Sequence, residues 1–145
     1  MDVPALIALR PMIEAVTAKR CSFCFWVYGP RLPDTLRVIE GWGLTFKSEL
    51  LVWHKIASKK FGTGYTTRKS VENAWLATPR RGGLKRRDKG VEQFFEAPRR
   101  DHSEKPDAAY EALERLYGDV RRLDLFARRT RPGWVPWGNE VTGEV

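Results

Sequence analysis

The stretch Cys21-Ser-Phe-Cys-Phe-Trp-Val-Tyr28 is the longest apolar run in this chain of 145 residues. It is too apolar and too aromatic for a surface helix. A run without polar alternation is typical of a strand that is buried on both faces, as in a parallel sheet. Gly29-Pro30 ends this strand, and the spacing of Leu36 and Ile39 predicts a helix over residues 33–40. The fold is therefore expected to contain a buried strand followed directly by a helix.

Strands and helices continue to alternate outward from this stretch. Further strands are expected over residues 46–56, 71–77, 91–96 and 122–127. One or two short helices are expected over residues 3–19, with a restart at Pro11, and another helix over residues 105–117. Residues 57–70 are expected to form a loop, and the tail over 128–145, rich in Trp, Pro and Gly, is expected to be irregular. This alternation predicts one α/β domain over residues 1–145 with parallel strands, whose ligands bind at the carboxyl ends of the strands.

Composition excludes several classes of protein. Hydrophobic residues make up 42% of the chain and aromatic residues 12%, which is enough for a core and excludes a disordered chain. No apolar run reaches the roughly 20 residues that a membrane helix needs. Asp2 and Arg10 do not fit a signal peptide, and two cysteines provide no disulfide framework. A cytoplasmic domain without a membrane partner is therefore expected.

Positive charge is concentrated in one part of the chain. The net charge is +8 and the pI is about 9.8, which favours a polyanionic partner, nucleic acid above all. A basic domain without such a partner has the same composition. Residues 80–100 hold eight basic and three acidic residues, a net of +5. Such a stretch is either a flexible loop that follows phosphate groups or a solvated surface loop.

The spacing Cys21-x-x-Cys24 is typical of metal and redox sites. A zinc site takes four ligands, however, and the other candidates, His54 and His102, are isolated in the sequence. Positions i and i+3 of a strand also point to opposite faces. No metal site is therefore predicted, and structural cysteines are favoured.

Polar side chains that suit a ligand occur near two predicted elements. Lys105 lies at the start of the clearest helix, where the helix dipole favours an anion, although Pro106 alone would explain a plain helix start. Arg128, Asn139 and Glu140 follow the strand predicted over 122–127 and can hydrogen-bond a polar ligand. A tail that only covers the edge of the sheet is the alternative.

A series of short motifs then occurs in a recognisable order. They are Phe25-Trp26-Val27, Trp42-Gly43-Leu44, Leu51-Val-Trp53-His-Lys55, Gly62-Thr-Gly64-Tyr65-Thr-Thr-Arg68, Glu72, Ala97-Pro98-Arg99, His102-Ser-Glu-Lys105-Pro-Asp107, Leu123-Asp-Leu-Phe126-Ala-Arg128 and Gly133-Trp134 with Trp137-Gly-Asn139-Glu140. This order resembles the N6-adenine methyltransferase family that includes the catalytic subunit of the messenger-RNA adenosine methyltransferase and many bacterial and phage DNA enzymes. The resemblance covers residues 6–141.

The resemblance implies a Rossmann-like methyltransferase fold that binds S-adenosylmethionine. By similarity, Lys105 would pair with the methionine carboxylate of this cofactor. Arg128 and Asn139 would hold its ribose hydroxyls, and Glu140 would lie near its adenine or ribose.

The resemblance also implies contacts with nucleic acid. The loop over residues 62–68 would lie beside the target base, and the basic stretch after Thr78 would face the phosphate backbone. The implied nucleic-acid residues are Tyr65, Arg68, Lys69, Glu72, Arg80, Arg81, Lys85, Arg86 and Arg87.

One motif of the family, Asp-Pro-Pro-Trp, is absent. The only Pro-Trp pair, Pro136-Trp137, has no acid before it, so no catalytic residue is assigned. The amine of adenine is a poor nucleophile, and acceptors such as an Asp carboxylate must bind its hydrogens while an aromatic face holds the base. In the family this motif ends a central strand, expected here between the strands at 21–28 and 122–127. Its loss would leave two bare strand edges that recruit a partner chain, a second copy or another protein.

Two functions follow from the resemblance. The first is an adenine methyltransferase domain, truncated at its N-terminus relative to the family, with DNA favoured over RNA as substrate and little or no activity as given. In this interpretation Met1 is an internal methionine of a longer protein. The second is a catalytically dead relative that serves as a nucleic-acid-binding or partner subunit.

Overall fold

The computed structural model describes residues 1–56, 62–101 and 103–141. Its helices are α1 (Val3–Ala8), α2 (Arg10–Val16), α3 (Leu32–Gly41) and α4 (Asp107–Tyr117), with a short 3-10 turn, η1 (Gly29–Arg31), before α3. Asp2 caps α1 by accepting a hydrogen bond from the Ala5 N–H at 2.9 Å. Pro11 lies in the first turn of α2, so residues 3–19 form two short helices, one of the two forms expected for them. The predicted helices are thus confirmed.

The main sheet contains four strands in the order β1-β5-β2-β6. They are β1 (Phe23–Val27), β2 (Leu44–Ile56), β5 (Val71–Pro79) and β6 (Phe94–Pro98). β5 runs antiparallel to both of its neighbours, whereas β2 and β6 are parallel. The predicted α/β class is confirmed, but the prediction of parallel strands is wrong for β5.

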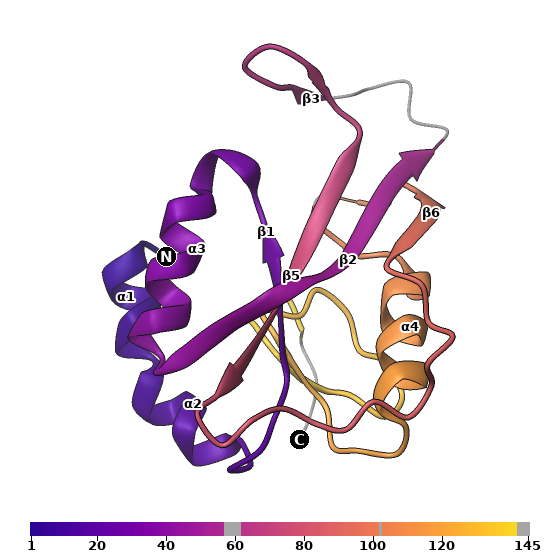
Figure 1. The fold of residues 1–145 in the computed structure, drawn as a ribbon. Coiled ribbons are helices and arrows are strands. Elements are labelled where there is room, and N and C mark those ends of the chain that lie inside the picture. The colour runs from indigo at the N-terminus through magenta and orange to yellow at the C-terminus, as the bar shows by residue number, and fades with distance from the viewer. Residues whose placement is uncertain (57–61, 102, 142–145) are drawn as a thin grey trace.

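The connection between β2 and β5 explains this difference. Its described part, residues 62–70, contains two short antiparallel strands, β3 (Gly62–Thr63) and β4 (Arg68–Lys69), where a loop was expected. The remainder of the expected loop, 57–61, lies outside the described residues. A parallel neighbour requires a crossover, usually a helix, whereas a hairpin-like connection returns the chain antiparallel. In Figure 1 this hairpin extends beyond one end of the sheet.

Helices cover both faces of the sheet. The helices α1, α2 and α3 lie on one face and α4 lies on the other (Figure 1). The first core is centred on Ile13, Ile39 and Trp42, and the second contains Leu51 and Ala109. Side chains of β1 alternate between the two cores, because successive strand residues point to opposite faces. Phe23 and Phe25 pack against the first core, and Cys24 and Trp26 against the second.

The C-terminal segment forms a second, smaller sheet. β7 (Leu123–Leu125) pairs in parallel with β8 (Val135–Trp137). The strand expected over 122–127 is therefore shorter than predicted, and Phe126, with a φ of 61°, ends it. The expectation of an irregular tail is wrong for β8, since an extended segment that contains a proline can still pair at a sheet edge. Residues 142–145 of the expected tail lie outside the described residues.

An apolar cavity of about 1570 Å³ separates the two sheets. Its walls include β1 and β7. Among the described residues, β1 pairs only with β5, and β7 pairs only with β8. This gap coincides with the predicted position of the missing central strand.

Candidate functional site

The carboxyl ends of three strands meet at one end of the main sheet. β1 and β2 both run antiparallel to β5 and are therefore parallel to each other, and β6 is parallel to β2. β5 begins at this end, where Glu72 lies opposite Trp53 of β2. The segment before α4 brings Lys105 to the same place. The sequence prediction of a site at the carboxyl ends of strands thus corresponds to a cluster of charged side chains.

Glu72 is the centre of this cluster, because its two carboxylate oxygens contact two lysines. Lys55 Nζ lies 2.5 Å from Oε1, and Lys105 Nζ lies 2.5 Å from Oε2. Burial alone would raise the pKa of Glu72, but the hydrogen bonds and charges of Lys105 and Lys55 outweigh it and hold this pKa below its usual value. Two lysines on one carboxylate leave a net positive charge, which favours a further anion.

The ammonium groups of Lys55 and Lys105 each lie over the ring of a tryptophan. Lys105 Nζ lies 5.0 Å from the centre of the Trp26 ring, and Lys55 Nζ lies 5.3 Å from that of Trp53. Ring faces attract cations, so these contacts fix the ammonium groups in position without neutralising them.

Among the described side chains of the hairpin β3–β4, only that of its last residue, Lys69, lies in the site. Lys69 Nζ lies 4.1 Å from the ring centre of Tyr28, directly after β1. Lys69, Glu72 and Lys55 line a small polar cavity of about 270 Å³. Arg68 is exposed, and Tyr65 is completely exposed. Lys69 and Glu72 therefore lie in the site, whereas Tyr65 and Arg68 extend from it toward solvent.

The residues expected to bind the cofactor are only partly brought together. Lys105 and Arg128 line the large cavity. Arg128 donates a hydrogen bond of 2.9 Å to the exposed carboxylate of Glu140. Asn139 is also exposed, and neither Asn139 nor Glu140 lines the cavity. The ribose-binding role of Asn139 therefore stays a prediction.

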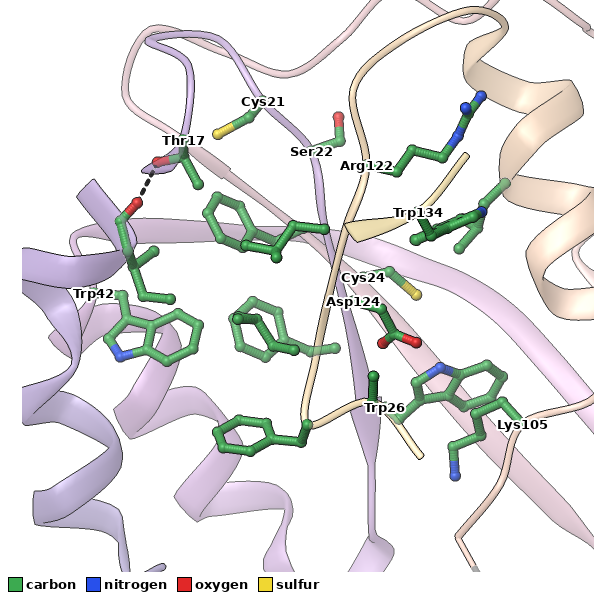
Figure 2. A pocket seen from close by; sticks show the side chains of 18 of the residues that line it. Thr17, Cys21, Ser22, Cys24, Trp26, Trp42, Lys105, Arg122, Asp124 and Trp134 are labelled. Atoms are coloured by element: carbon green, nitrogen blue, oxygen red, sulfur yellow. Dashed lines mark hydrogen bonds between the residues drawn. The ribbon is translucent and has the colours of Figure 1, made fainter. Parts of the chain in front are cut away.

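Asp124 is a residue of the cavity that sequence reasoning missed. Figure 2 shows Asp124, Cys24, Trp26 and Lys105 on the same side of this cavity. Burial raises the pKa of Asp124, although its carboxylate accepts a hydrogen bond of 2.8 Å from the Tyr110 hydroxyl. Burial, followed by the negative charge of Asp124, raises the pKa of the Cys24 thiol to about 12. The sequence did contain a signal for this residue. Asp124 is a carboxylate inside the strand predicted over residues 122–127, and buried carboxylates are rare without a partner or a role.

The first part of the basic stretch, residues 80–87, lies at the opposite end of the main sheet, whereas its last two basic residues, Arg99 and Arg100, line the small polar cavity with Glu72. Pro79, the last residue of β5, pairs with Leu44, the first residue of β2. The segment that follows passes α4, where the Arg87 N–H donates to the Leu116 carbonyl. The side chains of Arg80, Arg81, Lys85, Arg86 and Arg87 are all exposed. The structure does not bring them together with Glu72, and their role in nucleic-acid binding stays a prediction.

The cysteines do not mark a metal site in the described residues. Cys21 precedes β1, and Cys24 lies within it. Across residues 1–56, 62–101 and 103–141, no three His, Cys, Asp or Glu side chains are grouped so that they could hold a metal ion. His102 lies outside these residues. No helix in the same ranges has the length and apolar character to cross a membrane.

Comparison with known sequences identifies the family. The sequence model of the MT-A70 family matches residues 3–140. The chain belongs to the MT-A70 family. The predicted resemblance to N6-adenine methyltransferases is thus confirmed, and the mixed α/β architecture is consistent with the Rossmann-like fold predicted for this MT-A70 domain.

Relatives of the MT-A70 domain include bacterial, plant and human proteins. It is 27% identical over 129 residues to the type II methyltransferase M.MunI of a Mycoplasma species, an alignment that covers 89% of the chain and 54% of that protein. It is 29% identical over 126 residues to an Arabidopsis thaliana N(6)-adenosine-methyltransferase MT-A70-like protein, covering 81% of the chain and 18% of the relative. A segment of 40 residues is 48% identical to human N(6)-adenine-specific methyltransferase METTL4, covering 28% of the chain and 8% of the relative. The chain spans about half the length of M.MunI and less of the others.

Proposed function

We propose that this MT-A70 domain binds S-adenosylmethionine and nucleic acid, DNA in preference to RNA, and does not transfer the methyl group on its own. The cluster of Glu72 with Lys55 and Lys105 carries the proposal. It lies at the carboxyl ends of the strands, keeps a net positive charge, and adjoins the cavity that Lys105 shares with Arg128. In open α/β sheets this is where ligands bind.

The side chains fit the charges of S-adenosylmethionine. Lys105 suits its carboxylate, and the half-buried Asp124 on the same cavity suits a positively charged group. Arg128 reaches this cavity from the end of β7 and would hold hydroxyl groups, with Glu140 orienting its guanidinium. When bound, S-adenosylmethionine supplies an electrophilic methyl group.

The acceptor side of the reaction is incomplete. An adenine amine needs hydrogen-bond acceptors for its hydrogens and an aromatic surface that holds the base. The sequence contains no Asp-Pro-Pro-Trp motif. Glu72, the carboxylate at the centre of the site, already accepts from Lys55 and Lys105. Cofactor binding without transfer is therefore the expected behaviour, and it also fits a catalytically dead subunit.

Two assays on the same preparation test this proposal. Calorimetric titration with S-adenosylmethionine is expected to give saturable heat, and incubation with labelled S-adenosylmethionine is expected to leave adenine-containing DNA and RNA oligonucleotides unlabelled. Absence of heat would contradict cofactor binding. Labelled adenine would show that the chain is an active methyltransferase without the missing motif, and label in RNA alone would also overturn the proposed preference for DNA.

Nucleic-acid binding can be assigned to one end of the sheet by paired substitutions. Changing Arg68 and Lys69 to glutamate is expected to weaken binding of a fluorescent DNA duplex about tenfold at low salt, because two phosphate contacts next to the site become repulsive. The matched control changes Arg80 and Arg81 to glutamate, which alters the net charge by the same amount at the end of the main sheet opposite to Glu72. Fluorescence anisotropy measures both. A larger loss for the second pair would place the DNA on the basic stretch instead.

A further inference from the structure

Two arginines contact the same two acids on either side of Lys105. Glu104 Oε1 lies 3.1 Å from Arg100 Nε and 3.1 Å from Arg129 Nε. Asp107 Oδ2 lies 2.8 Å from Arg100 Nη1, and its Oδ1 lies 2.5 Å from Arg129 Nη2. Each guanidinium therefore bridges both carboxylates, as the planar fork of arginine allows. We call the two arginines and the two acids the arginine clamp.

The two arginines of the clamp follow strands in different sheets. Arg100 follows β6 in the main sheet, whereas Arg129 follows β7 in the second sheet. The guanidinium carbon of Arg129 also lies 5.4 Å from the ring centre of Tyr110 in α4. The Tyr110 hydroxyl in turn donates a hydrogen bond to Asp124 of β7. The clamp thus joins the segment before α4 to the ends of two strands.

A third arginine, Arg131, contacts one acid of the clamp. Its Nη1 lies 3.0 Å from Asp107 Oδ1, and its Nε lies 2.8 Å from Glu114 Oε1 in α4. Among the described ion pairs, Arg131 therefore joins Asp107 to α4 and not to Glu104. The link between Glu104 and Asp107 depends on Arg100 and Arg129.

The clamp is partly shielded from solvent and stays charged at neutral pH. The side chain of Glu104 is 18% exposed and that of Arg129 is 28% exposed, so salt screens their attraction less than that of a surface pair. The hydrogen bonds of Arg129 and Arg100 outweigh desolvation and hold the pKa of Asp107 below its usual value. These contacts can therefore restrain the backbone between Glu104 and Asp107.

Lys105 needs such a restraint, because its backbone belongs to no helix or strand. Connecting segments of this kind are more mobile than the elements they join. Its ammonium group nevertheless lies 2.5 Å from Glu72 Oε2 and 5.0 Å from the centre of the Trp26 ring. We propose that Arg100 and Arg129 are positioning residues that hold Lys105 against Glu72 and Trp26. The consequence for cofactor affinity rests on the proposed function, whereas the position of Lys105 does not.

NMR of the lysine side chains measures the position of Lys105 without any cofactor. The ring current of Trp26 displaces the signal of the methylene group next to Nζ, and the absence of this signal from Lys105→Ala assigns it. In the double variant Arg100→Ala/Arg129→Ala, the displacement is expected to be lost, so that the signal moves to the position of exposed Lys85. Arg129→Ala alone is expected to lose part of the displacement, because Arg100 still bridges both acids.

Calorimetric titration with S-adenosylmethionine measures the consequence for binding. Each single alanine variant is expected to weaken binding about twofold, the size expected for one partly exposed ion pair. The double variant is expected to weaken it by more than the product of the two single effects, since either arginine alone still bridges the acids. Arg129→Lys in the Arg100→Ala background keeps the charge without the fork, and should bind as weakly as the double alanine variant.

Arg115→Ala is the matched control. Arg115 also makes two contacts to one carboxylate from α4, since its Nε and Nη2 lie 3.1 and 2.7 Å from Asp88 Oδ2. Its loss should change neither the Lys105 signal nor the affinity. An equal displacement of the signal in this variant would show a general effect of removing an arginine from the fold and overturn the proposal.

The remaining outcomes separate this proposal from the proposed function. An unmoved Lys105 signal in the double variant would overturn the proposal, as would full affinity of Arg129→Lys in the Arg100→Ala background. If the double variant does not fold, an unmoved signal in Arg129→Ala has the same meaning. Absence of heat from the unchanged chain would contradict cofactor binding, while the NMR signal would still test the clamp.

Discussion

Replacement of Lys105 by alanine is expected to weaken S-adenosylmethionine binding by about 10- to 150-fold. A hydrogen bond to a charged group contributes about 1.5–3 kcal/mol, and each 1.4 kcal/mol changes an affinity tenfold. The effect should reach this range because Lys105 is largely shielded from solvent, with 17% of its side chain exposed. Its ammonium group is also held in position by Glu72 and the Trp26 ring. Calorimetric titration of both proteins measures the change directly.

A matched lysine separates this local effect from a general loss of charge. Lys85→Ala removes the same charge at an exposed position on the basic stretch, at the other end of the sheet, and should leave affinity unchanged. Thermal unfolding of both variants shows whether Glu72, left with Lys55 alone, still supports the fold. Equal affinities for Lys105→Ala and the unchanged chain, with the fold intact, would remove Lys105 from the cofactor site.

The elements were predictable from the sequence, but the direction of β5 was predicted incorrectly. Residues 21–28 and 105–117 have strong local patterns, and their strand and helix formed as expected. The connection over 57–70 contains no helical pattern in the sequence, and a parallel crossover needs about a dozen residues or more, usually including a helix. An antiparallel β5 could therefore have been inferred. β8 could not, because pairing of a proline-containing segment depends on the neighbouring edge of β7 and not on its own residues.

The site was predictable only where it depends on local sequence and not on the pairing of distant elements. Lys105 was identified from its position before a helix, but its ion pair with Glu72 joins residues 33 positions apart and depends on the sheet register. The basic stretch shows the limit of reasoning from charge. Its composition indicates a polyanion, whereas the location of residues 80–87 depends on the direction of β5, which begins beside Glu72 and ends at Pro79. Because β5 is antiparallel to β2, its first residues, with Glu72, lie beside Lys55 at the carboxyl end of β2, and the basic residues after Pro79 lie at the other end.

Trp53 connects the core to the site, and its removal is expected to have the largest effect on stability. Its side chain is 1% exposed, its ring lies edge-on to that of Trp26, and its Nε1–H donates a hydrogen bond of 2.9 Å to the Ala97 carbonyl. Trp53→Ala is expected to lower the free energy of unfolding by about 3–5 kcal/mol, as for other large buried residues. That is a large part of the 5–15 kcal/mol typical of a domain. Urea unfolding followed by circular dichroism measures it.

Trp53→Phe separates packing from hydrogen bonding at this position. Phenylalanine keeps most of the buried ring but leaves the Ala97 carbonyl without its donor, so a loss of about 1–3 kcal/mol is expected. Tyr65→Ala, at a side chain that is completely exposed, should leave stability unchanged. If Trp53→Phe were as destabilising as Trp53→Ala, the hydrogen bond to β6 would be the main contribution of Trp53. β6 and β2 would then be joined chiefly by polar contacts at the carboxyl ends that carry the site.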